Sequence, residues 1–350
     1  MKPHPVIRVL GVLALAITLL LPVGCKSDTV PGVVSYWPKA EKERTVPKPP
    51  KPSRWPLTGL DAPSEEVLSQ RVVSVKVENS PTARPQTNLQ LADVVYESIT
   101  EGGITRFNAI FHSQSPDTVG PVRSARLSDL CIVPQYHALF VFSGASDSVN
   151  SRIAASSIED LSEDAGISYP FFRAKDRPMP HNLYVVLAKV REEAAKRKMV
   201  TTQEVKGLAF DQRAMESSTA VTEISIPFST ANKVVWTYAA STGRYLRVNS
   251  GAKHMDKATG TQLSARNVVV LWAKHNVASK DVVGSVTYEI ILSGSGRASV
   301  FHDGQRFDGT WEAGTDAPPV FKASDGTQIK LAPGNTWFQV VQPSVNIVLD

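Results

Sequence analysis

Residues 71–77 read RVVSVKV, and this stretch sets the pattern for the first half of the chain. Its odd-numbered valines point to one face of an extended segment while Ser74 and Lys76 point to the other, because side chains along a strand alternate between faces. Four more segments are rich in strand-forming residues, so we expect a sheet of about five strands. These segments are 93–97, 104–111, 118–122 and 138–142.

Helical segments are expected between and after these strands. Asn182 is predicted to cap a helix that runs to about Lys198, because the apolar residues at 183, 187, 190 and 194 lie on one face at helical spacing. Another helix is expected to begin near Ser124. The first half is therefore predicted to be an α/β-type mixed sheet with helices.

The second half carries short β-rich runs separated by turn-forming pairs. Asp303-Gly304 and Asp325-Gly326 stand between alternating segments, which is a strong signal for β-hairpins. Even spacing of short strands predicts a smaller all-β domain, either a sandwich or an open barrel. The runs include 233–238, 244–248, 267–272, 285–292, 298–302, 320–322, 328–331, 336–341 and 346–349.

The expected fold class is α+β with two domains. The boundary falls between Val205 and Glu223, where the pattern changes. We place the N-terminal α/β domain at 57–212 and the C-terminal β domain at 213–350.

Residues 1–25 predict a lipoprotein signal peptide. Two bases precede an apolar run at 9–23, which rises only about 22 Å as a helix, short of the roughly 30 Å hydrocarbon core. Residues 21–25 (LPVGC) resemble a bacterial lipobox but have Pro22 where Leu is usual. We expect Cys25 to carry lipid, palmitate included, and to anchor the chain on the outer, extracytoplasmic face of the cell membrane. A plain secretory signal with a chance cysteine is the alternative.

Residues 26–56 predict an extended tether. Seven prolines favour polyproline conformation and prevent a packed core. Residues 1–56 hold nine of the 38 Lys and Arg residues and three of the 33 Asp and Glu residues, which leaves the body with 29 bases, 30 acids and a net −1. A near-neutral body argues against a nucleic-acid partner. The tether's bases either lie near anionic headgroups or are simply solvated.

No standard catalytic or metal-binding motif occurs in the sequence. It contains no H-E-x-x-H, Walker A, G-x-S-x-G or paired C-x-x-C pattern, and its seven histidines lack metal-ligand spacing. We therefore expect no metal and no cofactor. Because the sequence names no nucleophile–base pair, a binding protein ranks ahead of an enzyme.

Polar segments of the first half supply the candidate binding residues. Each places charged or amide side chains at the end of an expected strand, where α/β folds commonly gather their sites. Arg123 and Arg126 are three residues apart, and neighbouring guanidiniums need an anion between them. That anion is either Glu97 or Glu101, or a bound phosphate or carboxylate. The candidate ligand-binding residues are Arg84, Glu97, Glu101, Arg106, Arg123, Arg126, His181 and Asn182.

Seven stretches of the body carry a family resemblance. They are 84–86 (RPQ), 92–97 (ADVVYE), 101–107 (EGGITRF), 120–126 (GPVRSAR), 180–184 (PHNLY), 307–311 (FDGTW) and 333–337 (PGNTW). Together they resemble the YerB-type lipoproteins, a bacterial family of unassigned function with an N-terminal and a C-terminal domain. The resemblance covers nearly everything after the tether and implies a two-domain exported lipoprotein. It implies no reaction.

A weaker analogy concerns the segment from 104 to 126. Two expected strands followed by Arg123 and Arg126 are similar to the LytR-CpsA-Psr enzymes, which transfer glycopolymers from polyprenyl-pyrophosphate carriers to cell wall. Those enzymes also place arginines after a strand to hold the pyrophosphate, but their Pro-Arg-Asp run is absent here. The analogy therefore rests on fold alone.

Three functions are compatible with these features. The first is a non-catalytic envelope protein that binds an anionic envelope ligand, such as a cell-wall component, or a protein partner through an Arg-lined strand-end pocket. The second is an enzyme on phosphate-linked cell-wall or polyprenyl-carrier substrates. The third is a structural module in which a buried Arg–Glu network fixes the fold. Burial of Arg123 and Arg126 against Glu97 or Glu101 would favour the third.

Overall fold

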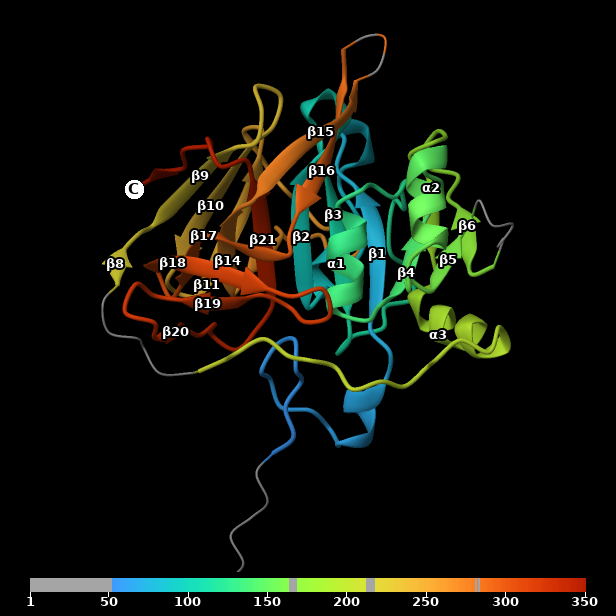
Figure 1. Ribbon diagram of the computed structural model, residues 1–350, viewed down its shortest axis with the longest axis horizontal. Helices are drawn as coiled ribbons and strands as arrows, with labels where there is room; N and C mark the ends of the chain where they lie inside the picture. The colour runs from blue at the N-terminus through green and yellow to red at the C-terminus, as the bar shows by residue number, and fades with distance from the viewer. Residues whose placement is uncertain (1–51, 164–168, 212–217, 281, 283) are drawn as a thin grey trace, which may run out of the picture. The chain divides into compact units, whose positions relative to one another are not determined.

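The computed structural model describes residues 52–163, 169–211, 218–280, 282 and 284–350 (Figure 1). The predicted signal peptide, the lipobox Cys25 and most of the tether lie outside these residues. The last residues assigned to the tether pack on the body, because Trp55 is buried and its backbone N–H donates to the carbonyl of Leu60. Among the described residues, none of the helices has the length and apolar character needed to span a bilayer.

Within the described residues, twelve strands from both halves of the chain form one mixed sheet. Eleven of them follow the order β20 (Gln328–Ile329), β19 (Val320–Lys322), β18 (Gln305–Ala313), β17 (Gly294–His302), β14 (Asn267–Trp272), β21 (Thr336–Val341), β2 (Val94–Ile99), β3 (Thr105–Phe111), β1 (Val73–Glu78), β4 (Leu139–Phe142) and β5 (Asp160–Ser162). The twelfth strand, β8 (Thr219–Ala220), pairs with β18.

The first-half strands confirm four of the five sequence predictions. β1 pairs antiparallel with β3, from Val73 opposite Phe111 to Glu78 opposite Arg106, and parallel with β4. The valines of β1 pack in the core on one face of the sheet, while Lys76 and Glu78 point to the other face, as the alternation predicts.

The two halves meet in the middle of this sheet, where β2 and β21 pair in parallel (Figure 1). Their register runs from Val94 opposite Thr336 to Ser98 opposite Val340. The structure is α+β, as expected, and its second half is rich in strands. The exact boundary between 212 and 213 stays a prediction, because residues 212–217 are not among those described.

A second sheet covers one face of the large sheet. Its apolar side chains, such as Ile224 and Trp236, share a core with Val268 and Trp337 of the large sheet, so the two sheets pack face to face. The six strands of this second sheet are β9 (Glu223–Pro227), β10 (Lys233–Ala239), β11 (Arg244–Asn249), β12 (Ala252–Lys253), β13 (Ser264–Ala265) and β22 (Val348–Leu349).

Helices α1 (Asp129–Gln135) and α2 (Asp147–Ala154) lie on the opposite face of the large sheet (Figure 1). Their buried residues, among them Ile132 and Val149, join a second core with Tyr96 and Phe338. The remaining described elements are α3 (Leu187–Lys196), the paired strands β6 (Phe171–Arg173) and β7 (Leu183–Val185), the hairpin β15 (Lys274–Lys280) and β16 (Val286–Ile291), and the 3-10 turns η1 (Glu66–Ser69), η2 (Pro81–Ala83), η3 (Leu89–Leu91) and η4 (Glu101–Gly103).

Two predictions around residues 118–128 are wrong. Residues 119–122 make only isolated bridges, to Val77, Thr87 and Val185, because Pro121 has no N–H to donate to a ladder. No helix begins near Ser124: the N–H groups of Arg123 and Ala125 donate to neighbouring segments, and α1 begins at Asp129.

The predicted cap at Asn182 is also wrong. Strand β7 follows Asn182 directly and packs its buried side chains in the core, so the helix begins only at Leu187. The apolar face at 187, 190 and 194 is confirmed, and all three side chains are buried.

Candidate functional site

Six charged or titratable side chains gather at one end of β1, β2 and β3. Glu78 ends β1 and lies opposite Arg106 of β3, while η4 connects β2 to β3 at the same end. The segment 119–126 crosses this end, since the backbone N–H of Arg123 donates to the carbonyl of Lys76. We call this group the strand-end cluster; it comprises Glu78, Glu101, Arg106, Arg123, Arg126 and His181.

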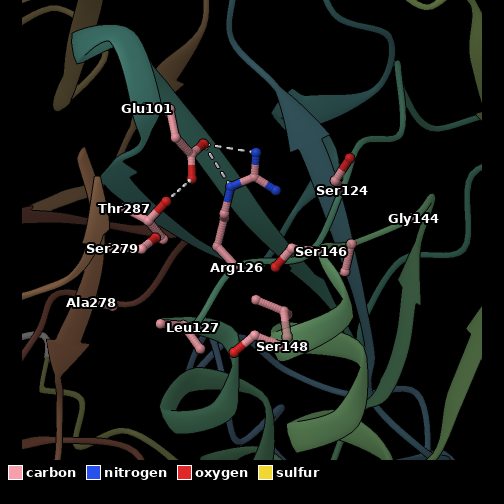
Figure 2. Close-up of a pocket in the computed structure, with 12 residues that line it drawn as sticks. Glu101, Ser124, Arg126, Leu127, Gly144, Ser146, Ser148, Ala278, Ser279 and Thr287 are labelled. Atoms are coloured by element: carbon pink, nitrogen blue, oxygen red, sulfur yellow. Dashed lines mark hydrogen bonds and ion pairs between the residues drawn. The ribbon is translucent and has the colours of Figure 1, made fainter. Parts of the chain in front are cut away.

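Glu101 and Arg126 form a hydrogen-bonded ion pair that solvent still reaches (Figure 2). Both Nε and Nη2 of Arg126 lie 2.7 Å from Oε2 of Glu101, and the hydroxyl of Thr287 donates to Oε1 at 3.1 Å. Burial is the largest effect and raises the pKa of Glu101, but the Arg126 guanidinium, a backbone hydrogen bond and the charge of Arg106 together leave the pKa below its usual value. The carboxylate is therefore ionised at neutral pH.

A cavity of about 440 Å³ lies beside this pair. Its walls come from η4, the segment at 124–127, the N-terminal turn of α2 and the β15–β16 hairpin (Figure 2). The lining is rich in hydroxyl groups, and only Leu127 and Val149 add sizeable apolar side chains. The hydroxyls belong to Ser124, Ser146, Ser148, Ser279 and Thr287.

Arg106 is a buried cation without a carboxylate partner. Its exposed fraction is 6%, and among the described residues no ion pair forms within 4.0 Å of its guanidinium. Nη1 donates to the carbonyl of Ser124 at 2.7 Å, whereas the buried Nε has no hydrogen-bond partner in the described part of the chain. Burial, followed by the positive charge of Arg126, lowers the pKa of Arg106 to about 9.

Glu78 is the buried centre of the other side of the cluster. Its carboxylate accepts hydrogen bonds from Nδ1 of His181 at 2.9 and 3.0 Å and from the hydroxyl of Ser80 at 2.7 Å. Nε of Arg123 lies 3.4 Å from Oε2 of Glu78. The imidazole of His181 is 22% exposed while Glu78 is 2% exposed, so the histidine stands between the carboxylate and solvent.

The charges of the strand-end cluster do not cancel. Three arginines face two glutamates, so the guanidinium groups outnumber the carboxylates by one. Beneath it, Lys76 and Asp129 are fully buried and neutralise each other at 2.6 Å. Burial lowers the pKa of Lys76, which the Asp129 carboxylate opposes.

Asp129 also shapes the cavity wall. Its Oδ2 accepts the backbone N–H of Arg126 at 2.7 Å, which holds the segment before α1 in place. Lys76 and Asp129 were not among the residues predicted from the sequence. A lysine within a valine-rich strand was the one signal that would have pointed to a buried partner.

Glu97 and Arg84 lie apart from the strand-end cluster. Glu97 faces the second sheet, where it pairs with Arg247 at 2.8 Å, and both side chains are fully buried. Arg84 donates to the side chain and the backbone carbonyl of Asn79. The Arg84 guanidinium has a lowered pKa because of burial and the nearby Arg247.

Asn182 stabilises the β6–β7 pair through hydrogen bonds of its side chain. Its amide donates to the carbonyl of Ala174 at 3.0 Å and accepts from Arg173 at 3.2 Å. Among the described residues, no group of three or more metal-ligating side chains comes together.

The chain matches a two-domain protein family and a curated bacterial protein described as a putative lipoprotein. Residues 57–200 match the family model described as "Protein of unknown function (DUF3048) N-terminal domain", and residues 224–338 match the model of the corresponding C-terminal domain. The "Putative lipoprotein YerB" of Bacillus subtilis (strain 168) is 30% identical over 307 residues, which is 86% of this chain and 90% of that protein.

A crystal structure of the YerB protein from Bacillus subtilis has the same fold. It superposes with a TM-score of 0.75 at 30% identity, covering 85% of this chain and 99% of that one. The chain therefore belongs to the DUF3048 family of YerB-like proteins, as the seven sequence stretches indicated. The family description assigns no biochemical function.

Proposed function

We propose that this chain is a lipid-anchored protein of the outer face of the cell membrane that binds an anionic envelope ligand in the cavity beside Arg126. The observation that carries the proposal is Arg106, a guanidinium only 6% exposed that forms no ion pair within 4.0 Å among the described residues, although Glu101 and Glu78 are near enough to act on its charge. A buried charge without a direct ion pair is costly, so an anion placed nearby would stabilise the folded protein.

The cavity gives such an anion a place to bind. Arg126 and the hydroxyl groups offer hydrogen-bond donors, and Ser124, whose carbonyl accepts from Arg106, forms part of the wall. The N-terminal turn of α2 contributes Ser146 and Ser148 to the same wall, and a helix N-terminus favours negative charge. A phosphate or carboxylate group of a cell-wall component has the matching chemistry.

A purely structural role explains part of the cluster. Arg126 pairs with Glu101 and Arg123 lies next to Glu78, as expected of a network that fixes the fold. Arg106 forms no such ion pair in the described part of the chain, and the arginines of the cluster outnumber its glutamates by one. The binding proposal accounts for this charge whereas the structural one does not.

Isothermal titration of the full chain in detergent with inorganic phosphate, pyrophosphate and acetate tests the proposal and separates phosphate from carboxylate ligands. Arg126→Ala should weaken binding of the preferred anion at least about 10-fold, since a charge-assisted hydrogen bond contributes about 1.5–3 kcal/mol. Arg123→Ala should also weaken it, with a melting temperature within a few degrees of wild type.

The matched control is Arg197→Ala, which removes an exposed arginine paired with Glu193 on α3. This variant should bind the anion as the wild type does. Equal affinities of wild type and Arg126→Ala for every probe would overturn the proposal, as would the absence of any anion binding.

A further inference from the structure

Next to the strand-end cluster, the hydroxyl of Thr82 contacts the imidazole of His181, which in turn contacts the carboxylate of Glu78. Oγ1 of Thr82 lies 3.3 Å from Nε2 and 3.4 Å from Nδ1 of His181, although the two residues are 99 positions apart in the chain. Nδ1 of His181 in turn lies 2.9 Å from Oε1 of Glu78. None of these three residues lines the cavity beside Arg126.

The hydrogen bonds determine the roles that these groups can take. An ionised Glu78 only accepts, so Nδ1 of His181 carries the proton that it donates to the carboxylate. The neutral ring then has Nε2 as its unprotonated nitrogen, 3.3 Å from the Thr82 hydroxyl. Because Oγ1 lies almost equally far from Nδ1, the hydroxyl has to move toward the Nε2 side of the ring to donate its proton. A carboxylate that orients a histidine in this way makes the other ring nitrogen a general base.

Burial decreases from the carboxylate to the hydroxyl. Glu78 is buried, His181 is partly exposed and Thr82 is exposed, so an incoming molecule meets the hydroxyl first. The turn that carries Thr82 is held by Arg177, whose guanidinium donates to the carbonyls of Ala83 and Pro85. The hydroxyl of Ser80 binds Glu78 at 2.7 Å and contacts Oγ1 of Thr82 at 3.0 Å.

We propose that Thr82 is an activated nucleophile and that this site transfers acyl groups from carboxylic esters to water. Oγ1 of Thr82 attacks the ester carbonyl carbon while His181 takes the hydroxyl proton. The carbon–oxygen bond to the leaving alcohol then breaks, and His181 returns the proton to that oxygen. Water, activated by the same imidazole, cleaves the acyl-threonine and restores the hydroxyl.

This activity is separate from anion binding at Arg126, since it needs neither Arg126 nor the cavity. The sequence alone named no nucleophile–base pair, because Thr82 and His181 are 99 positions apart and only the fold brings them together. Loss of one activity without the other is therefore the expected pattern when either site is changed.

Acetylation by p-nitrophenyl acetate tests the proposal on the full-length chain. We expect release of p-nitrophenol together with an acetyl group on the peptide that contains Thr82, detected by mass spectrometry. Thr82→Val keeps the shape of the side chain and should abolish this labelling. His181→Asn should slow it at least about 100-fold, the usual contribution of a general base.

The matched control is Thr242→Val, which removes an exposed turn hydroxyl and should label as the wild type does. Circular dichroism melting of each variant shows that it is folded. An acetyl group found only on other residues, an unlabelled wild type, or labelling of Thr82 that His181→Asn leaves unchanged would each overturn the proposal.

Discussion

Replacing Arg247 with methionine should cost the protein about 3–5 kcal/mol of unfolding free energy, because it leaves a buried carboxylate unpaired. Arg247 and Glu97 are both fully buried, with Nη2 of the arginine 2.8 Å from Oε1 of the glutamate. Burial lowers the pKa of Arg247, and Glu97 opposes that shift. The pair joins β11 of the second half to β2 of the first.

Aromatic rings and a histidine surround this guanidinium. Its carbon lies 4.9 Å from the ring centre of Trp337, 5.2 Å from that of Trp236 and 5.5 Å from that of Phe107. Nε donates to Nδ1 of His254 at 3.0 Å. Methionine fits these apolar surroundings, so the predicted loss comes mainly from Glu97 and not from a cavity.

The double variant Glu97→Gln/Arg247→Met isolates the charge effect. Glutamine keeps an acceptor for the hydroxyl of Thr105, which donates to Glu97 at 2.7 Å, and no unpaired charge remains. The double variant should therefore be more stable than the sum of the single losses predicts, by about 3 kcal/mol.

Urea unfolding followed by tryptophan fluorescence measures these values, since Trp236 and Trp337 flank the guanidinium. Arg197→Met, in an exposed pair, is the control and should change stability by less than about 1 kcal/mol. A loss below about 1 kcal/mol for Arg247→Met, or single losses that simply add in the double variant, would refute the reasoning.

Three further predictions concern other parts of the chain. Burial, followed by the charge of Arg191, lowers the pKa of His112 from 6.5 to about 4. Between these pH values the unfolded chain binds a proton that the folded chain does not, so lowering the pH from 7 to 4 should remove about 3 kcal/mol of stability through His112. Urea titrations should show that His112→Phe loses about 3 kcal/mol less stability than the wild type between pH 7 and 4. The same pH dependence of stability in both proteins would contradict the lowered pKa of His112. The buried hydroxyls of Tyr96 and Tyr136 lie 2.9 Å apart, and Tyr96→Phe would leave the Tyr136 hydroxyl without this partner. Thermal unfolding should therefore show that Tyr96→Phe lowers the unfolding free energy by about 1–3 kcal/mol, and that the double variant with Tyr136→Phe recovers most of this loss. Cys25→Ala should move the chain from the membrane pellet to the soluble fraction, and continued membrane association would rule out the lipid anchor.

The strands that the sequence predicted correctly are those with a strong local signal. Alternating valines identified β1, and β-branched runs identified β14 and β21. What the sequence did not predict is that β2 and β21 pair and join the halves in one sheet. Parallel pairing between segments more than 200 residues apart has no local signal, because it depends on the assembled fold.

The errors at 123–128 and at 182 have a shared physical cause. In both places the backbone N–H groups bind distant partners, such as the carbonyl of Lys76 for Arg123 and that of Val119 for Val185. These tertiary hydrogen bonds outweighed a weak helical pattern. A helix was correctly expected where the apolar face at 187, 190 and 194 was regular.

The sequence predicted which residues form the candidate site better than it predicted which ion pairs they make. The structure brings Glu101, Arg106, Arg123, Arg126 and His181 together at one end of the sheet. Glu97 was weighed as a partner of the arginines, but it lies on the opposite face of β2 with Arg247. The distance along the sequence from Glu97 to Arg247 gave no hint of this pair.

Diffraction from crystals of the full chain grown with tungstate tests the central proposal most directly, because tungstate is a tetrahedral oxyanion that anomalous scattering locates without ambiguity. We predict an anomalous peak in the cavity within hydrogen-bond reach of Arg126, and its disappearance in crystals of Arg126→Ala. Tungstate bound only elsewhere on the surface, or retained in the cavity of the Arg126→Ala variant, would contradict an anion site built around the strand-end arginines.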